Sequence, residues 1–362
     1  MSKKVMVAMS GGVDSSAAAF LIKDKGFYVC GATMKLYKNP DVGIHEDNRP
    51  CCSLTDIEDA RNVAYKLGFD HYVFNFEHEF KIDVIDRFAL TYLDGKTPNP
   101  CIDCNRYIKF GKLLKRARQL NMDYIATGHY ARIDMHEKTG RYHLRKAKDP
   151  LKDQTYFLYS LTQDQLKHTL FPLGDLTKSE VRAIAESQGL LNAHKRDSQD
   201  ICFVPDGDYA GFLRQVNKIP SPPGDFIDSS GKVLGRHRGL IYYTIGQRRG
   251  INLSFDSPMY VIKKDKNSGA VTLGSEEELF SDKMLVENVN WIPFDSPVGS
   301  IRATVKTRYS QKEAPATIRV DSDGNCLVVF DDKQRAITPG QAAVFYSDDM
   351  VVGGGTIISC LS

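Results

Sequence analysis

The string Ser10-Gly11-Gly12-Val13-Asp14-Ser15-Ser16 is the strongest indication of the fold of this chain. It follows a short apolar run, Lys4–Met9, that is typical of a strand, and it opens a helix-like run, Ser15–Lys25, that stops at Gly26. Glycines between a strand and a helix let the backbone approach an anion, and the first N–H groups of the helix lie at its positive dipole end. The stretch therefore predicts a phosphate-binding loop.

Two features define what this loop could bind. Ser10, Ser15 and Ser16 can donate hydroxyl hydrogen bonds to phosphate oxygens, and Asp14 could help to hold Mg²⁺. The lysine of the Walker motif GxxxxGK[ST] is missing, so the loop is of another kind. The alternative is a glycine turn that merely opens a structural helix. The full string after a first strand favours a nucleotide site.

Outward from the loop, the first half of the chain alternates strand-like and helix-like runs. Two sets of four residues, Thr55–Glu58 and Thr177–Glu180, have the form of a capping box that starts a helix. The alternation predicts an α/β fold with a doubly wound parallel sheet. The expected strands are Lys4–Met9, Tyr28–Met34, His71–Phe76 and Asp123–Thr127, and the expected helices cover 15–25, 55–68, 78–93, 105–120 and the run from 177 to Gly189.

The pattern changes near residue 206. Beyond a proline-rich turn region, Pro220–Gly224, the expected strands are short and turns are frequent. We expect two small, mainly β domains here, the second resembling a barrel. The predicted division is 1–205, 206–280 and 281–362. The expected strands are 260–263, 271–273, 301–306, 317–320, 326–330 and 342–346.

Composition and charge indicate the class of protein, its expected location and its possible partners. Hydrophobic residues make up 42% and charged residues 26%, which is typical of a globular protein. No apolar run is long enough for a membrane span, and the start of the chain lacks a signal-peptide pattern, so we expect a cytoplasmic protein with no membrane partner. The net charge is only +3, but the stretches 231–250 and 302–312 carry several Lys and Arg and no acid. These stretches suit an RNA backbone or, alternatively, form a solvated basic surface.

Three of the eight cysteines stand in suggestive positions. Cys101 and Cys104 precede a predicted helix, where the helix dipole and the nearby Arg106 and Lys109 should stabilise a thiolate. Cys202 lies in a second string, Asp197–Pro205. From the residues alone, sulfur or redox chemistry, a metal site and structural thiols all stay open. A zinc site would need a fourth ligand that is not evident, whereas three cysteines could hold an iron–sulfur cluster with one open iron.

The remaining cysteines carry no clear chemistry. Cys51 and Cys52 are adjacent and poorly placed to chelate one ion together, so we interpret them as structural. Cys30 falls within a predicted strand and should be part of the core, and Cys326 and Cys360 have no partner motif.

The glycine loop resembles the pyrophosphate loop of the N-type ATP pyrophosphatases, a group that includes GMP synthetase, NAD synthetase, argininosuccinate synthetase and tRNA-thiolating enzymes. Almost the whole chain resembles one of these, the tRNA-specific 2-thiouridylase family. The resemblance implies cleavage of ATP between its α- and β-phosphates and a sheet of the same kind. The matching strings are Ser10–Ser16, Met34-Lys35, Thr97–Phe110, Thr127–Tyr130, Lys152–Gln154, Asp197–Phe203, Tyr243–Gly250, Arg308-Tyr309 and Thr338–Gln341.

The resemblance assigns roles to the cysteines. Cys104 falls on the family's nucleophile, and Cys202 on the cysteine that carries the persulfide sulfur; the two would end the reaction as a disulfide. Many members have Asp where this chain has Cys101, which leaves the role of Cys101 open and keeps an iron–sulfur cluster on Cys101, Cys104 and Cys202 as an alternative.

The resemblance also implies the other ligands and partners. The substrate is a tRNA with a wobble uridine, adenylated by ATP with Mg²⁺, and the sulfur comes from a donor protein, either a cysteine desulfurase or a sulfur-relay protein. The catalytic part would be 1–205, a central RNA-binding part 206–280, and the barrel-like part 281–362. The implied ATP contacts are Ala8, Met9, Ser10, Gly11, Gly12, Val13, Asp14, Ser15, Met34 and Gly128, and the implied tRNA contacts are His129, Lys152, Asp153, Gln154, Arg308, Tyr309 and Gln341.

The sequence leaves two alternative functions to consider. A ligase that adenylates a small metabolite for attack by ammonia would need an amidotransferase partner and gives no role to Cys104 and Cys202. A nucleotide-gated RNA-binding or sulfur-carrier protein without catalysis would not need the intact loop together with both cysteines.

Overall fold

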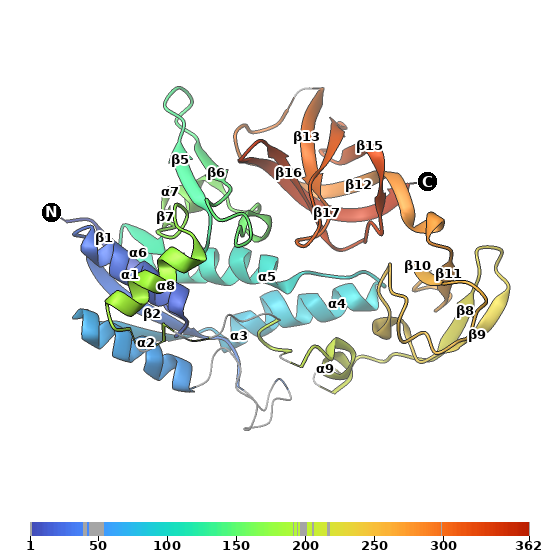
Figure 1. The fold of residues 1–362 in the computed structure, drawn as a ribbon, viewed down its shortest axis with the longest axis horizontal. Coiled ribbons are helices and arrows are strands. Elements are labelled where there is room, and N and C mark those ends of the chain that lie inside the picture. The colour runs from blue at the N-terminus through green and yellow to red at the C-terminus, as the bar shows by residue number, and fades with distance from the viewer. Residues whose placement is uncertain are drawn as a thin grey trace. The chain divides into compact units, whose positions relative to one another are not determined.

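A computed structural model describes residues 2–38, 42, 54–190, 192–193, 195, 201–204, 206–215, 218–297 and 299–361 (Figure 1). Cys51, Cys52 and most of the Asp197–Phe203 string lie outside these residues. The chain divides into two compact units, and neither is a continuous piece. The first comprises Met1–Val84, Cys101–Gly207 and Asp349–Val351; the second comprises Ile85–Pro100, Asp208–Asp348 and Val352–Ser362.

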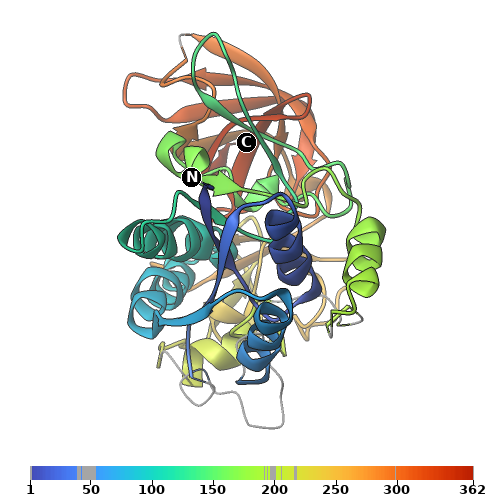
Figure 2. The ribbon, with the colours of Figure 1, turned by 90° about the vertical axis from the view of Figure 1, so that its left-hand side faces the viewer.

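The first unit is built on a five-stranded sheet in the order β3-β2-β1-β4-β7. All four pairings are parallel, and Figure 2 shows helices on both faces, which confirms the predicted doubly wound α/β fold. The order reverses at β1, whose neighbours are β2 and β4, so the carboxyl end of β1 is the switch point where ligands bind in such sheets. The strands are β1 (Lys4–Ala8), β2 (Tyr28–Lys35), β3 (His71–Asn75), β4 (Tyr124–Ala126) and β7 (Thr169–Leu170).

Apolar packing on this sheet explains its stability. The side chains of Val5, Val7, Ile22 and Val63 are buried together between strands and helices. Burial of such side chains is worth about 1.5–3 kcal/mol each. The helices of the first unit are α1 (Val13–Asp24), α2 (Leu54–Leu67), α3 (Glu77–Phe80), α5 (Pro100–Asp103), α6 (Leu114–Gln119), α7 (Gln163–Lys167) and α8 (Lys178–Ser187), with the 3-10 turn η4 (Thr155–Phe157).

Of the two capping boxes predicted at helix starts, the structure has one. Thr177 caps α8 with the predicted capping box, since its side chain accepts from the Glu180 N–H and the Glu180 side chain accepts in return. The second predicted box is wrong, because α2 already begins at Leu54 and Thr55 lies inside it.

The helix that carries the cysteines also begins earlier than expected. It starts at Pro100 rather than Asn105, with α5, continues as the π-helix η3 (Cys104–Leu113), and ends as α6. Proline suits the first helical position, because its missing N–H is not needed there. Cys104 therefore lies inside the helix, more than one turn from its N-terminus.

The second unit contains a small sheet in the order β10-β11-β8-β9, with β8 and β11 parallel. Phe226, Tyr243, Val261 and Leu273 are buried together in its core. The elements are β8 (Gly224–Ile227), β9 (Val233–His237), β10 (Tyr260–Lys264) and β11 (Val271–Gly274), the helices α4 (Arg87–Leu93) and α9 (Tyr209–Gln215), and the 3-10 turns η5 (Leu240–Tyr242) and η6 (Glu277–Leu279); the π-helix η2 (Lys81–Asp86) leads into α4.

Six antiparallel strands follow in the order β12-β15-β14-β13-β16-β17, and β12 pairs with β17 to close a barrel. The predicted barrel is confirmed, but its two longest strands, β12 and β17, were not predicted. Gly353 and Gly355 interrupt the strand pattern of β17, yet a Cβ at either would lie about 2.6 Å or less from a carbonyl oxygen of β12. The strands are β12 (Phe280–Trp291), β13 (Ser300–Lys306), β14 (Ala314–Val320), β15 (Cys326–Arg335), β16 (Ala342–Ser347) and β17 (Met350–Leu361).

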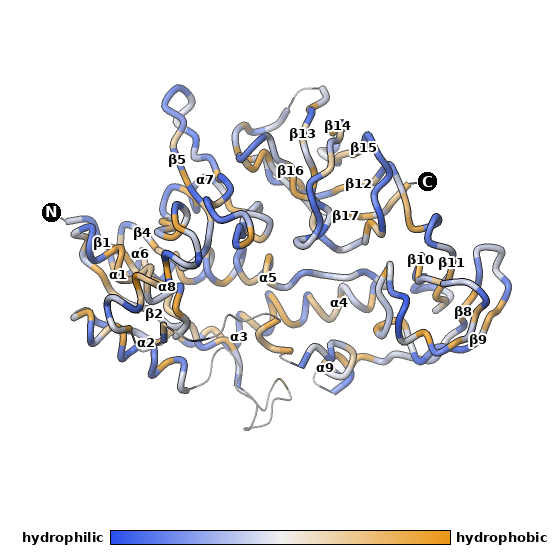
Figure 3. The backbone as a smooth tube through the Cα atoms, viewed as in Figure 1, coloured by the Kyte–Doolittle hydropathy of each residue, from blue (hydrophilic) through white to orange (hydrophobic). Residues whose placement is uncertain are grey.

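The first unit also includes a hairpin of β5 (Arg132–Met135) and β6 (Tyr142–Arg145), in which Arg145 pairs with Met350 of β17. Figure 3 shows the tip of this hairpin in the hydrophilic colour. No helix within the described part of the chain is long and apolar enough to cross a membrane.

Candidate nucleotide and thiol site

The glycine loop lies at the carboxyl end of β1, as its sequence predicts. Gly11 has φ +73°, and a Cβ there would lie 2.5 Å from the carbonyl oxygen of Asp56, so only glycine fits. The Ser15 hydroxyl accepts from the Ser10 N–H at 3.2 Å and donates to the Gly12 carbonyl at 3.0 Å. No side chain among the described residues caps Gly12 at the start of α1. The first N–H groups of α1 thus face the loop without an intrahelical partner.

The segment after β4 packs directly on this loop. A Cβ on Gly128 would lie 2.8 Å from the Asp14 carbonyl carbon and the Ser15 nitrogen. The Gly128 position that the resemblance links to ATP therefore permits the close approach of two backbone segments. Of the other implied contacts, Met9 is buried, and Met34 lies near the end of β2, half-buried.

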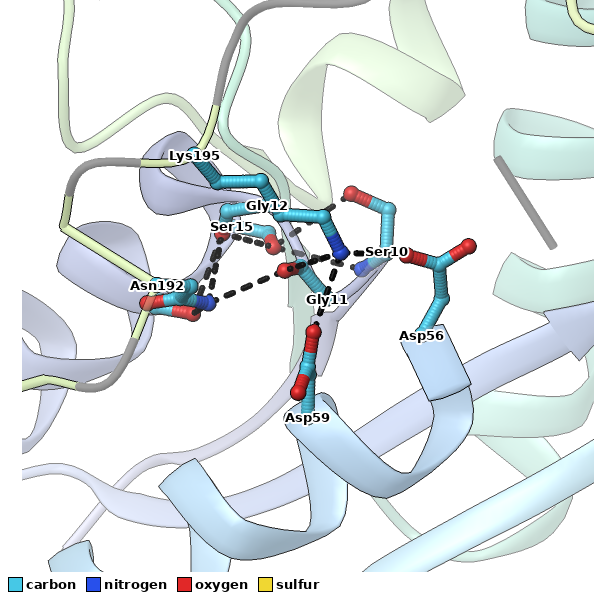
Figure 4. Close-up of polar contacts among 9 residues, drawn as sticks. Ser10, Gly11, Gly12, Ser15, Asp56, Asp59, Asn192 and Lys195 are labelled. Atoms are coloured by element: carbon cyan, nitrogen blue, oxygen red, sulfur yellow. Dashed lines mark hydrogen bonds and ion pairs between the residues drawn. The ribbon is translucent and has the colours of Figure 1, made fainter. Parts of the chain in front are cut away.

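Sequence reasoning missed two side chains that hold the loop from outside (Figure 4). The Asn192 amide donates to the Gly11 carbonyl at 3.0 Å and to the Ser16 hydroxyl at 2.7 Å. The Lys195 ammonium lies 3.4 Å from the Gly11 carbonyl and 3.0 Å from an Asp59 oxygen, and it also contacts Asp56. Both come from a segment far away in sequence with no recognisable motif, so only the fold reveals them.

Asp14 is held by two side chains from other elements. The Lys178 ammonium lies 2.7 Å and 2.8 Å from its two carboxylate oxygens, and the Tyr130 hydroxyl donates to the first at 2.8 Å. Both carboxylate oxygens of Asp14 therefore already have partners. The Asp14–Lys178 ion pair links the start of α1 to the start of α8. Lys178 was not predicted, since a single lysine beside a capping box carries no signal.

Cys104 is a buried free thiol at the start of η3. Burial raises the pKa of the Cys104 thiol, and the positive charge of Lys109 opposes that rise. The predicted low thiol pKa is therefore wrong, because the sulfur is buried and its desolvation outweighs the nearby positive charge. Cys101 is exposed, yet the dense protein around it raises its thiol pKa to about 11.

Cys202 is half-buried. Its carbonyl accepts a 2.6 Å hydrogen bond from the Tyr37 hydroxyl, just beyond β2. The adjacent Phe203 ring meets the Phe80 ring of α3 edge-on, with centroids 5.7 Å apart. Since α3 also packs against η3, the same short helix supports both the Cys104 helix and the Cys202 segment.

No three His, Cys, Asp or Glu side chains gather at a spot able to hold a metal in the part of the chain that the structure describes. Cys101, Cys104 and Cys202 are thus not arranged here as ligands of one cluster.

His129 lies beside the Cys104 helix. Its ring contacts Phe110 of η3, at 5.8 Å between centroids, and shares a 2.7 Å hydrogen bond with the Thr127 hydroxyl. Burial, helped by the charge of Lys109, holds the pKa of His129 well below its usual value. The ring is therefore neutral at pH 7, and its expected contact with RNA would be as a neutral group.

Two of the next three expected tRNA contacts are occupied within the protein. The Asp153 carboxylate is buried and accepts from the Ala147 N–H at 3.0 Å and the Thr155 hydroxyl at 2.6 Å. The Gln154 side chain accepts from the Tyr130 N–H at 2.9 Å. Lys152 is half-buried on the same loop.

The second unit holds the last three expected contacts. The Arg308 guanidinium donates to the carbonyls of Ile245 and Ala336, at 3.0 Å and 3.2 Å. The Gln341 amide donates to the Thr97 carbonyl at 2.8 Å. Tyr309, in contrast, is 38% exposed, with the Lys306 ammonium 5.9 Å from its ring centre.

Profiles of known families cover most of the chain. The family described as the tRNA methyl transferase HUP domain matches residues 3–206, the tRNA methyl transferase PRC-barrel domain matches 211–275, and the aminomethyltransferase beta-barrel domain matches 281–357. Among solved structures, a 4-thiouridine synthetase–RNA complex with bound ATP is 16% identical, with a TM-score of 0.34 over 56% of this chain and 45% of that one.

A doubly wound parallel sheet with a glycine loop at its switch point defines an α/β protein of the nucleotide-binding kind, and the matched HUP-domain family covers this sheet. The tRNA-specific 2-thiouridylase MnmA of Clostridioides difficile (strain 630) is 50% identical over 99% of this chain and 98% of its own length. That of Thermoanaerobacter pseudethanolicus is 51% identical over 98% of both chains. The chain belongs to the tRNA-specific 2-thiouridylase family.

Proposed function

We propose that this protein uses ATP to activate the 2-oxygen of a wobble uridine in tRNA and replaces that oxygen with sulfur to give 2-thiouridine. The observation that carries the proposal is that one unit contains both the loop and the two thiols, and that α3 supports both thiol segments. The alternative ammonia-dependent ligase leaves these thiols without a role.

The loop is suited to the first step. The hydroxyls of Ser10 and Ser15 and the first N–H groups of α1 bind phosphate oxygens. Lys195, which is paired with Asp56 and Asp59, holds the Gly11 carbonyl and so keeps the loop in place. Attack of the uracil 2-oxygen on the α-phosphorus breaks the α–β bond and releases pyrophosphate. The oxygen then leaves as AMP, a far better leaving group than oxide.

Cys202 and Cys104 have different roles in the second step, the transfer of sulfur. A donor protein, a cysteine desulfurase or a sulfur-relay protein, loads a persulfide on Cys202. In one route its terminal sulfur attacks C2, AMP leaves, and the Cys104 thiolate attacks the inner sulfur. In the other, Cys104 attacks the inner sulfur first and releases hydrosulfide, which attacks C2. Both routes end in a Cys104–Cys202 disulfide, so an external thiol must supply two electrons per turnover.

Cys104 must lose its proton for either route. Since burial raises its pKa, most of the thiol is protonated at neutral pH. Lys109 is the neighbouring positive charge that opposes this, and it lies five residues further along a π-helix, where hydrogen bonds run between residues five apart. Lys109 therefore stabilises the thiolate that the reaction needs.

Neither implied metal group fits the described residues well. Asp14, the carboxylate expected to hold Mg²⁺, has both oxygens engaged by Lys178, and the three cysteines do not form a cluster site within the described ranges. We therefore assign no step to Mg²⁺ or to an iron–sulfur cluster, and we favour the persulfide.

We further propose the three-part division 1–205, 206–280 and 281–362, with RNA bound by the two later parts. The exposed Tyr309 and the basic stretches of these parts suit an unpaired base and phosphates.

The test is thiolation by metal-free protein given ATP, tRNA, a persulfide donor and a thiol. Mass spectrometry should detect 2-thiouridine at the wobble position, with release of AMP and pyrophosphate. Cys202→Ser should lose sulfur loading, Cys104→Ser should load sulfur but lose turnover, and Cys101→Ser should stay largely active. Asp14→Asn removes the charge that Lys178 pairs with at the start of α1 and should therefore slow pyrophosphate release.

Two results would contradict the proposal. Release of ADP and phosphate would exclude the pyrophosphatase chemistry. Product that forms only after iron and sulfide are restored would replace the persulfide by a cluster.

A further inference from the structure

A pocket of about 320 Å³ lies in the second unit, where the end of α4 meets the end of β10. Figure 1 shows these two elements close together. Four lysines and two aspartates line it: Lys96, Lys263, Lys264, Lys266, Asp94 and Asp265. Such a concentration of ammonium groups around one hollow is unlike the chain as a whole, whose net charge is only +3.

Lys264 is the unusual member. Its ammonium nitrogen is buried, and no hydrogen-bond acceptor among the described residues reaches it. An ammonium has three donors, and leaving them unpaired away from water is costly. The Tyr92 ring, with its centre 5.8 Å from the nitrogen, offers only a partial compensation through a cation–π contact. Burial accordingly lowers the pKa of Lys264 to about 8.

The two aspartates do not neutralise the pocket. The Asp94 carboxylate forms an ion pair with the Lys266 ammonium at 2.7 Å. Asp265 accepts the backbone N–H of Asn267 at 2.9 Å, as part of its own turn. Asp265 keeps its negative charge and acts on Lys263, so the four lysines and two aspartates leave a net charge of +2 around the hollow, and an anion is the ligand that would balance it.

The surroundings indicate which anion. A Cβ on Gly340 would lie 2.9 Å from the Lys96 Cβ, so the pocket wall adjoins the segment that ends in Gln341. Gln341 is the position that the resemblance links to tRNA, and its amide holds the Thr97 carbonyl next to Lys96. Both contacts lie within the second unit.

We propose that this lysine pocket binds a phosphate of the tRNA backbone, with Lys264 as its inner ligand. The inference rests on the proposed function for its RNA partner. It assigns a site outside the residues that the family resemblance names. The phosphate oxygens accept hydrogen bonds from Lys264 and Lys96, and Lys263 adds charge at the rim.

The experiment measures tRNA affinity of the full-length protein against salt concentration. Loss of one phosphate contact flattens the slope of log K against log salt by about 0.9, which corresponds to about eightfold weaker binding at about 0.1 M salt. Lys264→Met, which keeps the apolar stem, should show this change, and Lys264→Arg should restore most of it. Lys283→Met is the matched control, since Lys283 is exposed on β12 beside Asp282 and outside the pocket.

A second measurement, made on the wild-type protein, tests the proposal even if the Lys264 variants do not fold. In the wild-type protein, the Lys264 pKa measured by NMR should rise when tRNA binds. If the slope and this pKa both stay unchanged while wild-type protein thiolates tRNA, the pocket is not an RNA site and the proposed function survives. Inorganic phosphate that raises the pKa while tRNA does not would show a small-anion site and also overturn the inference. Absence of thiolation by wild type would instead contradict the proposed function itself.

Discussion

Lys109 is the residue through which the chemistry of Cys104 can be tuned. Its charge lowers the thiol pKa against the effect of burial. Lys109→Met should raise that pKa further, so less thiolate exists at any neutral pH. The single-turnover rate of sulfur transfer, measured against pH, should keep its alkaline plateau but reach it at higher pH.

Lys112→Met is the matched control for this prediction. Lys112 lies on the same π-helix but is not among the charges that act on Cys104. Its rate profile should match the wild type. An unshifted profile in Lys109→Met would mean that another group sets the reactivity of the thiol.

At the scale of elements, Gly12 of the nucleotide loop and Gly128 of the segment that packs on it serve different purposes. A Cβ at Gly12 would meet only the Ser10 hydroxyl at 3.5 Å, an ordinary contact, whereas a Cβ at Gly128 would clash with the backbone of α1 at 2.8 Å. Gly12→Ala should therefore weaken ATP binding without changing Tm. Gly128→Ala should weaken ATP binding and also lower Tm.

Calorimetry and ATP titration of the two variants check this prediction. Equal thermal stability of both variants would show that the two backbone segments can separate at little cost. Unchanged ATP affinity in Gly12→Ala would place the phosphates away from the start of α1.

Arg308 and Tyr309 are adjacent in the sequence, but we expect one to stabilise the fold and the other to bind RNA. Arg308 ties together the carbonyls of Ile245 and Ala336, so Arg308→Ala should cost about 1–3 kcal/mol of unfolding free energy by leaving buried acceptors unsatisfied. Tyr309→Ala should lower the free energy of unfolding less than Arg308→Ala does, but it should weaken tRNA binding by about 1–3 kcal/mol, the value of one base stack.

Tyr309→Phe keeps the ring and should bind like the wild type. Filter binding and urea denaturation of the three variants distinguish the roles. Weak binding by Tyr309→Phe would point to the hydroxyl instead of stacking, and full binding by Tyr309→Ala would remove Tyr309 from the RNA contacts.

The elements show what sequence could and could not reveal. Strands β1, β2 and β3 and helix α8 were predicted within two residues, because their apolar runs and caps are local signals. Strand β17 was missed since its glycines make sense only against β12. In the site, the loop was evident from its own residues, whereas Asn192, Lys195 and Lys178 act across long sequence distances. The thiol pKa of Cys104 was misjudged because it depends on burial.

For the whole molecule, buried histidines predict sensitivity to mild acid. Burial lowers the pKa of His71, His129, His143 and His237 in the folded state. Below the unfolded value of about 6.5, the unfolded chain binds protons that the folded chain does not, so the free energy of unfolding falls as pH falls. Urea denaturation should give lower stability at about pH 5.5 than at about pH 7.5.

His71→Gln removes one of these groups and should flatten the pH dependence. Three of the four histidines belong to the first unit, so probes in that unit should report the larger loss. Stability that is constant or rises towards pH 5.5 would contradict the prediction.

The interleaving of the two units has a consequence for synthesis on the ribosome. Residues 85–100 emerge early but belong with residues that follow Gly207, and residues 349–351 join the first unit long after the rest of that unit has been made. At about 5–20 residues per second, the early segment waits for several seconds without its partners. That segment leads directly into the Cys104 helix, so a nascent chain acquires its finished thiol region only after the residues of the second unit beyond Gly207 have been made. Chains released prematurely should therefore be inactive and be recognised by chaperones and proteases.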